Sequence, residues 1–209
     1  MGFLEPTKIC KPGVFLLTKA VFSDKNMGNL VEPERIVPWM EKIAVYPGFF
    51  DPITNGHVDI ILRGLRLFDK ILVAVLKNPK KEALFSTKDR VAMIQEIFIR
   101  QPDIEVKAFD GLLVEFVRFV RRHKAKIVIR GLRAVSDFEY ELQMALMNRQ
   151  LDPEIETLYM MPSVHYSFLN SGVVKEVFSL GGSVTGLVPE IVEKKLREKL
   201  KQGRLSVGK

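Results

Sequence analysis

From about residue 42 onward the chain alternates between short apolar runs and longer segments with helical periodicity. Five such runs have the length and composition of buried strands, and a helical segment follows each one. The apolar runs are residues 43–46, 71–76, 104–108, 126–129 and 157–161. Strands that alternate with helices are typical of βαβ units around a parallel sheet. We therefore predict a Rossmann-like, doubly wound α/β fold, with a mostly parallel five-stranded sheet in a single domain.

Several of the helical segments carry recognisable start signals. Ser86 with Asp89, and Ser136 with Glu139, have the spacing of a capping box, and Pro189 suits the first turn of a last helix. The predicted helices cover residues 58–68, 91–99, 112–123, 136–147, 171–180 and 189–200. The chain has 209 residues and is 47% hydrophobic, which is enough for one well-packed domain.

The two ends of the chain differ from this regular part. Residues 1–40 contain four prolines and three glycines, and they lack the apolar core and cleavage site of a secretory signal. We interpret residues 1–40 as an N-terminal extension without a catalytic role. Residues 41–200 are the predicted catalytic domain, and residues 201–209 are a basic C-terminal tail.

Composition excludes several classes of protein. No apolar run reaches the roughly 18 to 20 residues of a membrane span. Cys10 is the only cysteine, so a disulfide framework within one chain is excluded, and no Cys/His spacing suggests a bound metal. A reducing, cytoplasmic location fits this composition. The net charge of +7 is concentrated in residues 193–209, which argues against a nucleic-acid partner.

The loop after the first strand contains the sequence Thr54-Asn55-Gly56-His57, placed where a helix begins. Helix N-termini present free N–H groups and a positive dipole, so they bind phosphate groups. His57 would then donate to a phosphoryl oxygen. The alternative is a purely structural turn, in which Asp51 or Thr54 caps the helix.

Other loops at the carboxyl ends of the predicted strands also suit anions. Lys80 and Lys81 follow the second strand, Arg130 and Arg133 follow the fourth, and residues 163–171 after the fifth supply hydroxyls and amides. In a parallel sheet these loops lie at one edge, near the point where the strand order reverses. The guanidinium group of one arginine can bind two oxygens of a phosphate at once. We therefore expect one site that handles a polyphosphate.

Four segments of the chain carry a family resemblance: YPGFFDPITNGH, NPKKEALF, IRGLRAVSDFEYELQMALMNRQL and YSFLNSGVVKEV. With them, the chain from about Glu41 to Leu200 resembles bacterial phosphopantetheine adenylyltransferases, members of the T/HxGH nucleotidyltransferase superfamily. The TNGH segment alone indicates only the superfamily, whereas IRGLRAVSDFEYE is far more specific. The resemblance implies adenylyl transfer from ATP, with Mg²⁺, to 4′-phosphopantetheine. The products are dephospho-CoA and pyrophosphate, and the family implies a homohexamer.

The resemblance also implies roles for individual residues. His57, Lys81 and Arg130 match the catalytic positions, and Lys175 matches a basic residue after the phosphate loop. The positions implied to bind ATP are Phe49, Phe50, His57, Gly131, Arg133, Glu141, Tyr166, Ser167, Phe168, Leu169, Asn170, Ser171 and Gly172. Those implied to bind the acceptor are Phe49, Lys81, Leu113, Arg130, Met147 and Asn148.

Two positions depart from the family pattern. Phe49 stands where the family has Thr or Ser, and Asn170 and Gly172 replace members of a serine run. These departures keep open a catalytically weakened homologue that binds nucleotide or CoA. A related nucleotidylyltransferase with another acceptor is the other alternative.

Overall fold

The structure, a computed structural model, describes residues 41–77, 82–111, 113–133 and 135–201. The strands are β1 (Ile43–Gly48), β2 (Lys70–Leu76), β3 (Ile104–Phe109), β4 (Ile127–Gly131) and β5 (Glu156–Met160). The helices are α1 (Asn55–Gly64), α2 (Thr87–Ile97), α3 (Leu113–Arg122), α4 (Val135–Leu151), α5 (Ser171–Ser179) and α6 (Glu190–Lys201), with a 3₁₀ turn at Val164–Tyr166. Strand and helix alternate as the sequence predicts.

The five strands form one sheet in the order β3-β2-β1-β4-β5, and all four neighbouring pairs are parallel. The chain moves outward from β1 to β3, then returns to the other side of β1 with β4. The strand order therefore reverses between β1 and β4. In open α/β sheets ligands bind outside the carboxyl ends of the strands at such a point. The doubly wound, Rossmann-like fold is confirmed.

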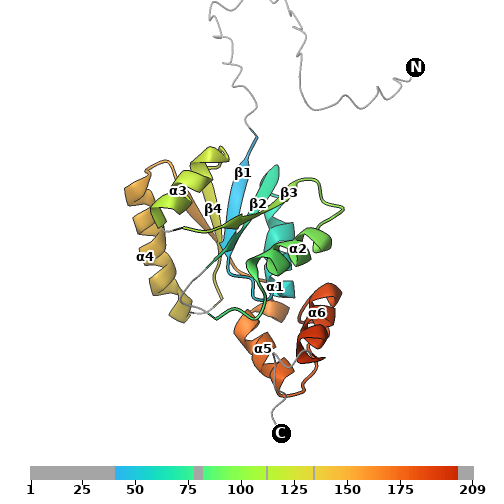
Figure 1. The fold of residues 1–209 in the computed structure, drawn as a ribbon. Helices are drawn as coiled ribbons and strands as arrows, with labels where there is room; N and C mark the ends of the chain where they lie inside the picture. The colour runs from blue at the N-terminus through green and yellow to red at the C-terminus, as the bar shows by residue number, and fades with distance from the viewer. Residues whose placement is uncertain (1–40, 78–81, 112, 134, 202–209) are drawn as a thin grey trace, which may run out of the picture. The chain divides into compact units, whose positions relative to one another are not determined.

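The strands are buried because helices cover both faces of the sheet (Figure 1). Figure 1 shows α3 and α4 on one side and α1 and α2 on the other. The residues of β1 and β2 alternate between the two cores. Ala44, Tyr46, Ile71, Val73 and Val75 belong to the core that also contains residues of α1, α2, α5 and α6. Val45, Leu72 and Ala74 face the core that contains α3. Burial on both faces explains the continuous apolar runs.

The two predicted capping boxes have different outcomes. The Ser86 hydroxyl accepts from the Asp89 amide and the Asp89 carboxylate accepts from the Ser86 amide, so the predicted capping box of α2 is confirmed. Ser136, in contrast, lies within α4, which begins at Val135 and continues to Leu151. The predicted helix start is therefore one residue late, and the side chain of Ser136 is outside the description, so its capping role stays a prediction.

The predicted first helix is also displaced: α1 ends at Gly64 rather than near residue 68. Among the described residues, no helix is long and apolar enough to cross a membrane. Residues 1–40 and 202–209 lie outside the described residues, so the predicted roles of the two ends stay predictions.

Candidate active site

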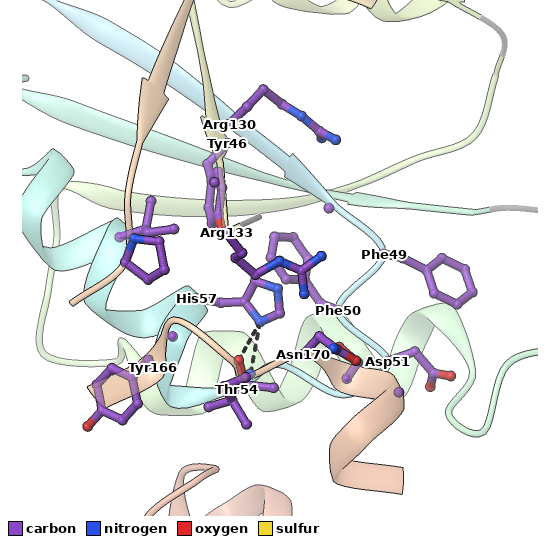
Figure 2. Close-up of a pocket in the computed structure, with 18 of the residues that line it drawn as sticks. Tyr46, Phe49, Phe50, Asp51, Thr54, His57, Arg130, Arg133, Tyr166 and Asn170 are labelled. Atoms are coloured by element: carbon purple, nitrogen blue, oxygen red, sulfur yellow. Dashed lines mark hydrogen bonds between the residues drawn. The ribbon is translucent and has the colours of Figure 1, made fainter. Parts of the chain in front are cut away.

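The turn between β1 and α1 brings His57 to the carboxyl end of the sheet. Thr54 has extended backbone angles and precedes the first residue of α1, so it occupies the N-cap position. Its backbone N–H donates to Nδ1 of His57 over 3.0 Å, and its hydroxyl lies 2.9 Å from the same atom (Figure 2). Of the two N-cap candidates for α1 in the sequence, Asp51 and Thr54, the structure therefore has Thr54. The imidazole folds back over the first turn of the helix.

These contacts determine where the proton of His57 lies. The amide of Thr54 can only donate, so Nδ1 of His57 is an acceptor. In a neutral imidazole the proton then belongs to Nε2. Burial, together with the positive charges of Arg133 and Arg130, lowers the pKa of His57 to about 4. Near neutral pH, His57 is thus an uncharged hydrogen-bond donor through Nε2.

Arg130 lies at the end of β4 and is held in two directions. It forms a bidentate ion pair with Glu141 of α4, in which Nε donates to Oε2 over 2.7 Å. Its third nitrogen donates to the carbonyl of Pro47 at the end of β1 over 3.0 Å. Burial acts to lower the pKa of Arg130, but the hydrogen bonds and charge of Glu141, with contributions from Tyr46 and Tyr140, raise the pKa overall. The guanidinium is therefore fixed and charged at the switch point.

Asp51 joins three segments that are far apart in sequence. Its buried carboxylate accepts hydrogen bonds from the amides of Leu84 and Phe85, at 3.0 and 2.9 Å. It also forms an ion pair of 3.0 Å with the ammonium group of Lys175 on α5. Asp51 thus ties the β1–α1 turn to the segment before α2 and to α5.

A second helix N-terminus faces the same site. Asn170 caps α5, and its side-chain oxygen accepts from the amide of Val173 at 2.9 Å. The hydroxyl of Ser171 donates to the carbonyl of Pro52 over 2.7 Å, which fastens α5 to the β1–α1 turn. Tyr166 packs against Gly56, where a β-carbon would come within 3.3 Å of the tyrosine side chain. Glycine at position 56 therefore allows the β1–α1 turn and the segment before α5 to approach closely.

These groups surround a cavity of about 860 Å³. Figure 2 shows His57 at its centre, with Arg133 in front of the imidazole and Arg130 beyond Tyr46. The cavity is lined by twelve of the residues predicted from sequence: Phe49, Phe50, His57, Arg130, Gly131, Arg133, Glu141, Tyr166, Leu169, Asn170, Ser171 and Gly172. Two helix N-termini and several cations make this cavity suited to a polyphosphate.

A second cavity, of about 420 Å³, adjoins the first at Arg130 and Glu141, which line both. Its wall is mostly apolar and includes Leu113, as predicted. Two buried polar atoms in this wall have no hydrogen-bond partner: Oδ1 of Asn148 on α4 and Oγ1 of Thr157 on β5. Buried polar atoms normally have partners, so these two atoms are exceptions within the described structure.

Comparison with known proteins agrees with this geometry. The model of the cytidylyltransferase-like family matches residues 45–177. The phosphopantetheine adenylyltransferase of Geotalea daltonii is 59% identical over 158 residues, which cover 76% of this chain and 96% of that protein. The protein of the same name from Geobacter sulfurreducens is 55% identical over 158 residues, 76% of this chain and 94% of that protein. The one from Caldanaerobacter subterraneus is 50% identical over 161 residues, 77% and 99% of the two chains.

The chain belongs to the phosphopantetheine adenylyltransferase family. The resemblance inferred from the sequence is thereby confirmed at the level of family and enzyme class. Within this adenylyltransferase, the roles of single residues stay predictions, and the structure shows only where each one lies.

Among the described residues, three of the predicted site residues line neither cavity: Ser167, Phe168 and Met147. Lys81 lies outside the described residues. Ser167 is exposed and donates to the carbonyl of Val164, and the Phe168 side chain is 61% exposed. Met147 lies on the outer side of α4 and is 50% exposed, whereas its neighbour Asn148 faces the second cavity. The helical rotation of 100° per residue separates these two neighbours.

Three residues that line the two cavities of this adenylyltransferase are not predicted from sequence as site residues: Tyr46, Asp51 and Thr157. Tyr46 is buried beside the cavity, and burial raises the pKa of its hydroxyl. Asp51 is predicted only as a possible cap, and Thr157 only as the first residue of the fifth strand. Tyr46 and Asp51 both sit at or just after the end of β1, which is the available signal. Thr157 has none, because a threonine in a strand is ordinary.

Proposed function

We propose that the protein transfers the adenylyl group of MgATP to 4′-phosphopantetheine, forming dephospho-CoA and pyrophosphate in the biosynthesis of coenzyme A. The observation that carries this proposal is the junction of the two cavities. A cationic cavity at two helix N-termini meets an apolar channel, and the Arg130–Glu141 pair forms their common wall. The acceptor phosphate and the α-phosphate of ATP would meet at this junction.

The reaction needs no nucleophile from the protein. An oxygen of the acceptor phosphate forms a bond to the α-phosphorus, while the bond from that phosphorus to the pyrophosphate oxygen breaks. The acceptor phosphate is already anionic at neutral pH, so no proton has to be removed from it. The protein contributes alignment and stabilisation of the charge on the transferring group.

His57 would supply the directed donor for this step. Its Nε2–H points away from the Thr54 cap, and its low pKa keeps the imidazole neutral. A neutral donor stabilises a phosphoryl oxygen without transferring a proton to it. His57 therefore acts as an electrostatic stabiliser and not as a general base.

Cations and amides around the first cavity would hold the phosphates of ATP. Asn170 opens α5, and the amides of the first turn of this helix are available to an anion. Arg133 and Lys175 line the same cavity. Lys175 also forms an ion pair with Asp51, which holds its ammonium group at the wall of the cavity.

The second cavity would hold the pantetheine arm. This arm has an apolar backbone interrupted by two amides and a hydroxyl, and the cavity wall has the same mixture. Oδ1 of Asn148 is an acceptor for an amide N–H, and Oγ1 of Thr157 can donate or accept. An apolar channel with a few oriented polar atoms is the usual form of a specific small-molecule site.

We further propose that the enzyme is a homohexamer and acts in the cytoplasm. The support for assembly is one face of α4, where large apolar side chains at i, i+4 and i+8 are exposed in the isolated chain: Phe138, Leu142 and Leu146. Exposed apolar faces of this kind mark interaction sites. The number of subunits follows from family resemblance alone.

The deciding experiment is pyrophosphate release with MgATP and one of three acceptors. Phosphopantetheine should give turnover, whereas nicotinamide mononucleotide and glycerol 3-phosphate should give none. Turnover with another acceptor would assign a different nucleotidylyltransferase. Binding of MgATP and phosphopantetheine by calorimetry without any pyrophosphate release would assign a homologue that has lost catalysis.

A further inference from the structure

Arg90 is a charged residue buried directly behind the β1–α1 turn. It belongs to α2, and only 2% of it is exposed. Its guanidinium donates to the carbonyls of Phe85 at 3.1 Å and Leu76 at 2.9 Å, to the hydroxyl of Thr87 at 2.9 Å, and to the carbonyl of Phe49. A buried guanidinium is costly unless its donors are satisfied, and here neutral backbone groups from three segments satisfy it.

The side chain of Phe49 covers the guanidinium of Arg90. The central carbon of that group lies 4.4 Å from the centre of the phenyl ring, which is the geometry of a cation–π contact. Figure 2 shows the ring of Phe49 pointing away from His57. Phe49 therefore meets Arg90 twice, through its ring and through its carbonyl. This pairing gives the aromatic side chain at position 49 a role that no hydroxyl would fill.

The contact to the Phe49 carbonyl has a consequence for the next residue. The peptide between Phe49 and Phe50 is trans and planar, so its N–H points opposite to its C=O. Because the C=O is directed at the buried Arg90, the N–H of Phe50 is directed to the other side of the turn. Phe50 also has a φ of 49°, in the left-handed region that residues other than glycine rarely adopt.

The side chain of Phe50 links the fixed Phe49–Phe50 peptide to His57 by direct contact. The rings of Phe50 and His57 are 5.1 Å apart and nearly perpendicular, with an interplanar angle of 81°. Phe50 also lies over Gly48, where a β-carbon would be 2.5 Å from the ring. The phenyl group is thus wedged between the strand end and the imidazole. A change in the Phe49–Phe50 peptide would displace the surface against which His57 rests.

We propose that Arg90 is a positioning residue for catalysis, which fixes the Phe49–Phe50 peptide from behind and thereby the orientation of His57. The proposal rests on the proposed adenylyl transfer for its kinetic consequence, although its structural consequence does not depend on that reaction. Arg90 itself contacts no substrate in this arrangement. Its effect should appear in the rate of the chemical step more than in the binding of ATP.

The test compares Arg90→Met with Met93→Ala. Met93 lies on the same helix, is 3% exposed and belongs to the core, so its truncation destabilises the protein but removes no hydrogen-bond donor to the Phe49 carbonyl. We expect Arg90→Met to lower kcat by about tenfold to a hundredfold, with the KM for ATP changed less than about threefold, because small misplacements cost this much. Met93→Ala should lower the melting temperature but leave kcat within about twofold at 25 °C.

Two milder variants keep the test decisive if Arg90→Met does not fold. Arg90→Lys retains the charge but not the fork that spans several carbonyls, so kcat should fall by roughly tenfold. Phe49→Leu removes the cation–π contact and keeps the carbonyl contact, so its loss should be smaller. Equal kcat for wild type, Arg90→Lys and Phe49→Leu would overturn the proposal.

A second readout is independent of turnover. Amide hydrogen exchange at residues 48–51 should accelerate at least tenfold in Arg90→Lys and stay at the wild-type rate in Met93→Ala. If the wild-type protein releases no pyrophosphate, the proposed function fails, and this exchange measurement still decides the role of Arg90. Unchanged exchange at residues 48–51 would refute that role, whatever the activity.

Discussion

Nδ1 of His57 lies 3.0 Å from the backbone nitrogen of Thr54 and 2.9 Å from its hydroxyl oxygen. The contact makes the signature histidine part of the cap of α1, so one interaction both starts the helix and selects the tautomer of the imidazole. The remaining ring nitrogen carries the proton and is the one available to a ligand. The catalytic and structural roles of His57 are therefore linked.

Replacing His57 separates these two roles. We expect His57→Ala to lower kcat by about a hundredfold to a thousandfold, as the loss of one oriented donor does in other enzymes. His57→Gln, whose amide nitrogen can approach the position of Nε2, should recover part of this loss. Steady-state kinetics with MgATP and phosphopantetheine would measure both. Near-normal turnover of the alanine variant would contradict the proposed role.

The low pKa of His57 predicts a specific dependence of stability on pH. The folded-state pKa is about 4 and the ordinary value is 6.5, so between these values the unfolded chain binds more protons than the folded one. Stability contributed by neutral His57 is thus complete above about pH 6.5 and is lost as the pH falls toward 4. The difference corresponds to roughly 3 kcal/mol.

Urea denaturation from pH 7.5 to 4.5 would measure this dependence. His57→Gln cannot titrate, so its free energy of unfolding should fall less over this interval than that of the wild type. Parallel curves for the two proteins would mean that the pKa of His57 is not lowered in the folded state.

Glu141 is expected to hold Arg130 in place for both substrates. Its carboxylate pairs with Arg130 at the wall between the cavities, and the Glu141 side chain is only 10% exposed. Glu141→Ala would leave a half-buried guanidinium without its partner, which we expect to cost about 2 kcal/mol of stability and at least tenfold in kcat/KM. Chemical denaturation and steady-state kinetics would measure the two effects.

The matched control is Glu154→Ala. Glu154 pairs with Lys126 at 3.0 Å, and both side chains are more than half exposed. Because exposed ion pairs contribute little, this variant should change stability by less than about 1 kcal/mol and leave kcat/KM unaltered. A similar loss in both variants would show that the Arg130–Glu141 pair has no special role.

The unpartnered atoms of Asn148 and Thr157 predict an effect on one substrate only. Thr157→Val and Asn148→Leu should each raise the KM for phosphopantetheine by about tenfold, since each removes about one hydrogen bond to the ligand. The KM for ATP should not change and serves as the internal control. Thr157→Val should also leave the folded protein as stable as the wild type or more so, because an unpaired buried hydroxyl is removed.

Assembly through α4 can be tested with a pair of matched substitutions. Leu146 on α4 and Leu67 after α1 are each 56% exposed in the isolated chain. Leu146→Glu should shift the protein to smaller species in analytical ultracentrifugation, because a charge would enter an apolar interface. Leu67→Glu should sediment like the wild type. Identical sedimentation of all three proteins would exclude this face of α4 as the interface.

Much of the fold follows from local patterns. Apolar runs bounded by turn residues mark β1 to β5, and the Ser86–Asp89 spacing marks the start of α2, because each depends on neighbours in sequence. The ends of α1 and α4 were misplaced: α1 ends at Gly64, although Leu65 and Phe68 continue its periodicity, and α4 continues to Leu151. Boundaries are the part that tertiary contacts adjust.

The site was predictable to the extent that a parallel sheet gathers its loops at one edge. His57, Arg130 and Arg133 were expected together for that reason, and they line one cavity. The partners of these residues were not predictable. Asp51 pairs with Lys175 across 124 positions, and Arg130 contacts Pro47 across 83 positions. No local pattern encodes contacts at such separations.

The sequence by itself determined the architecture, the family and the set of chemical groups at the sheet edge. Only the tertiary structure decided the state of those groups: which nitrogen of His57 carries the proton, why its pKa is low, and how Arg90 is buried behind Phe49. The physical reason is that secondary structure responds to neighbouring residues. Protonation, desolvation and ion pairing respond instead to every charge and atom that folding brings near.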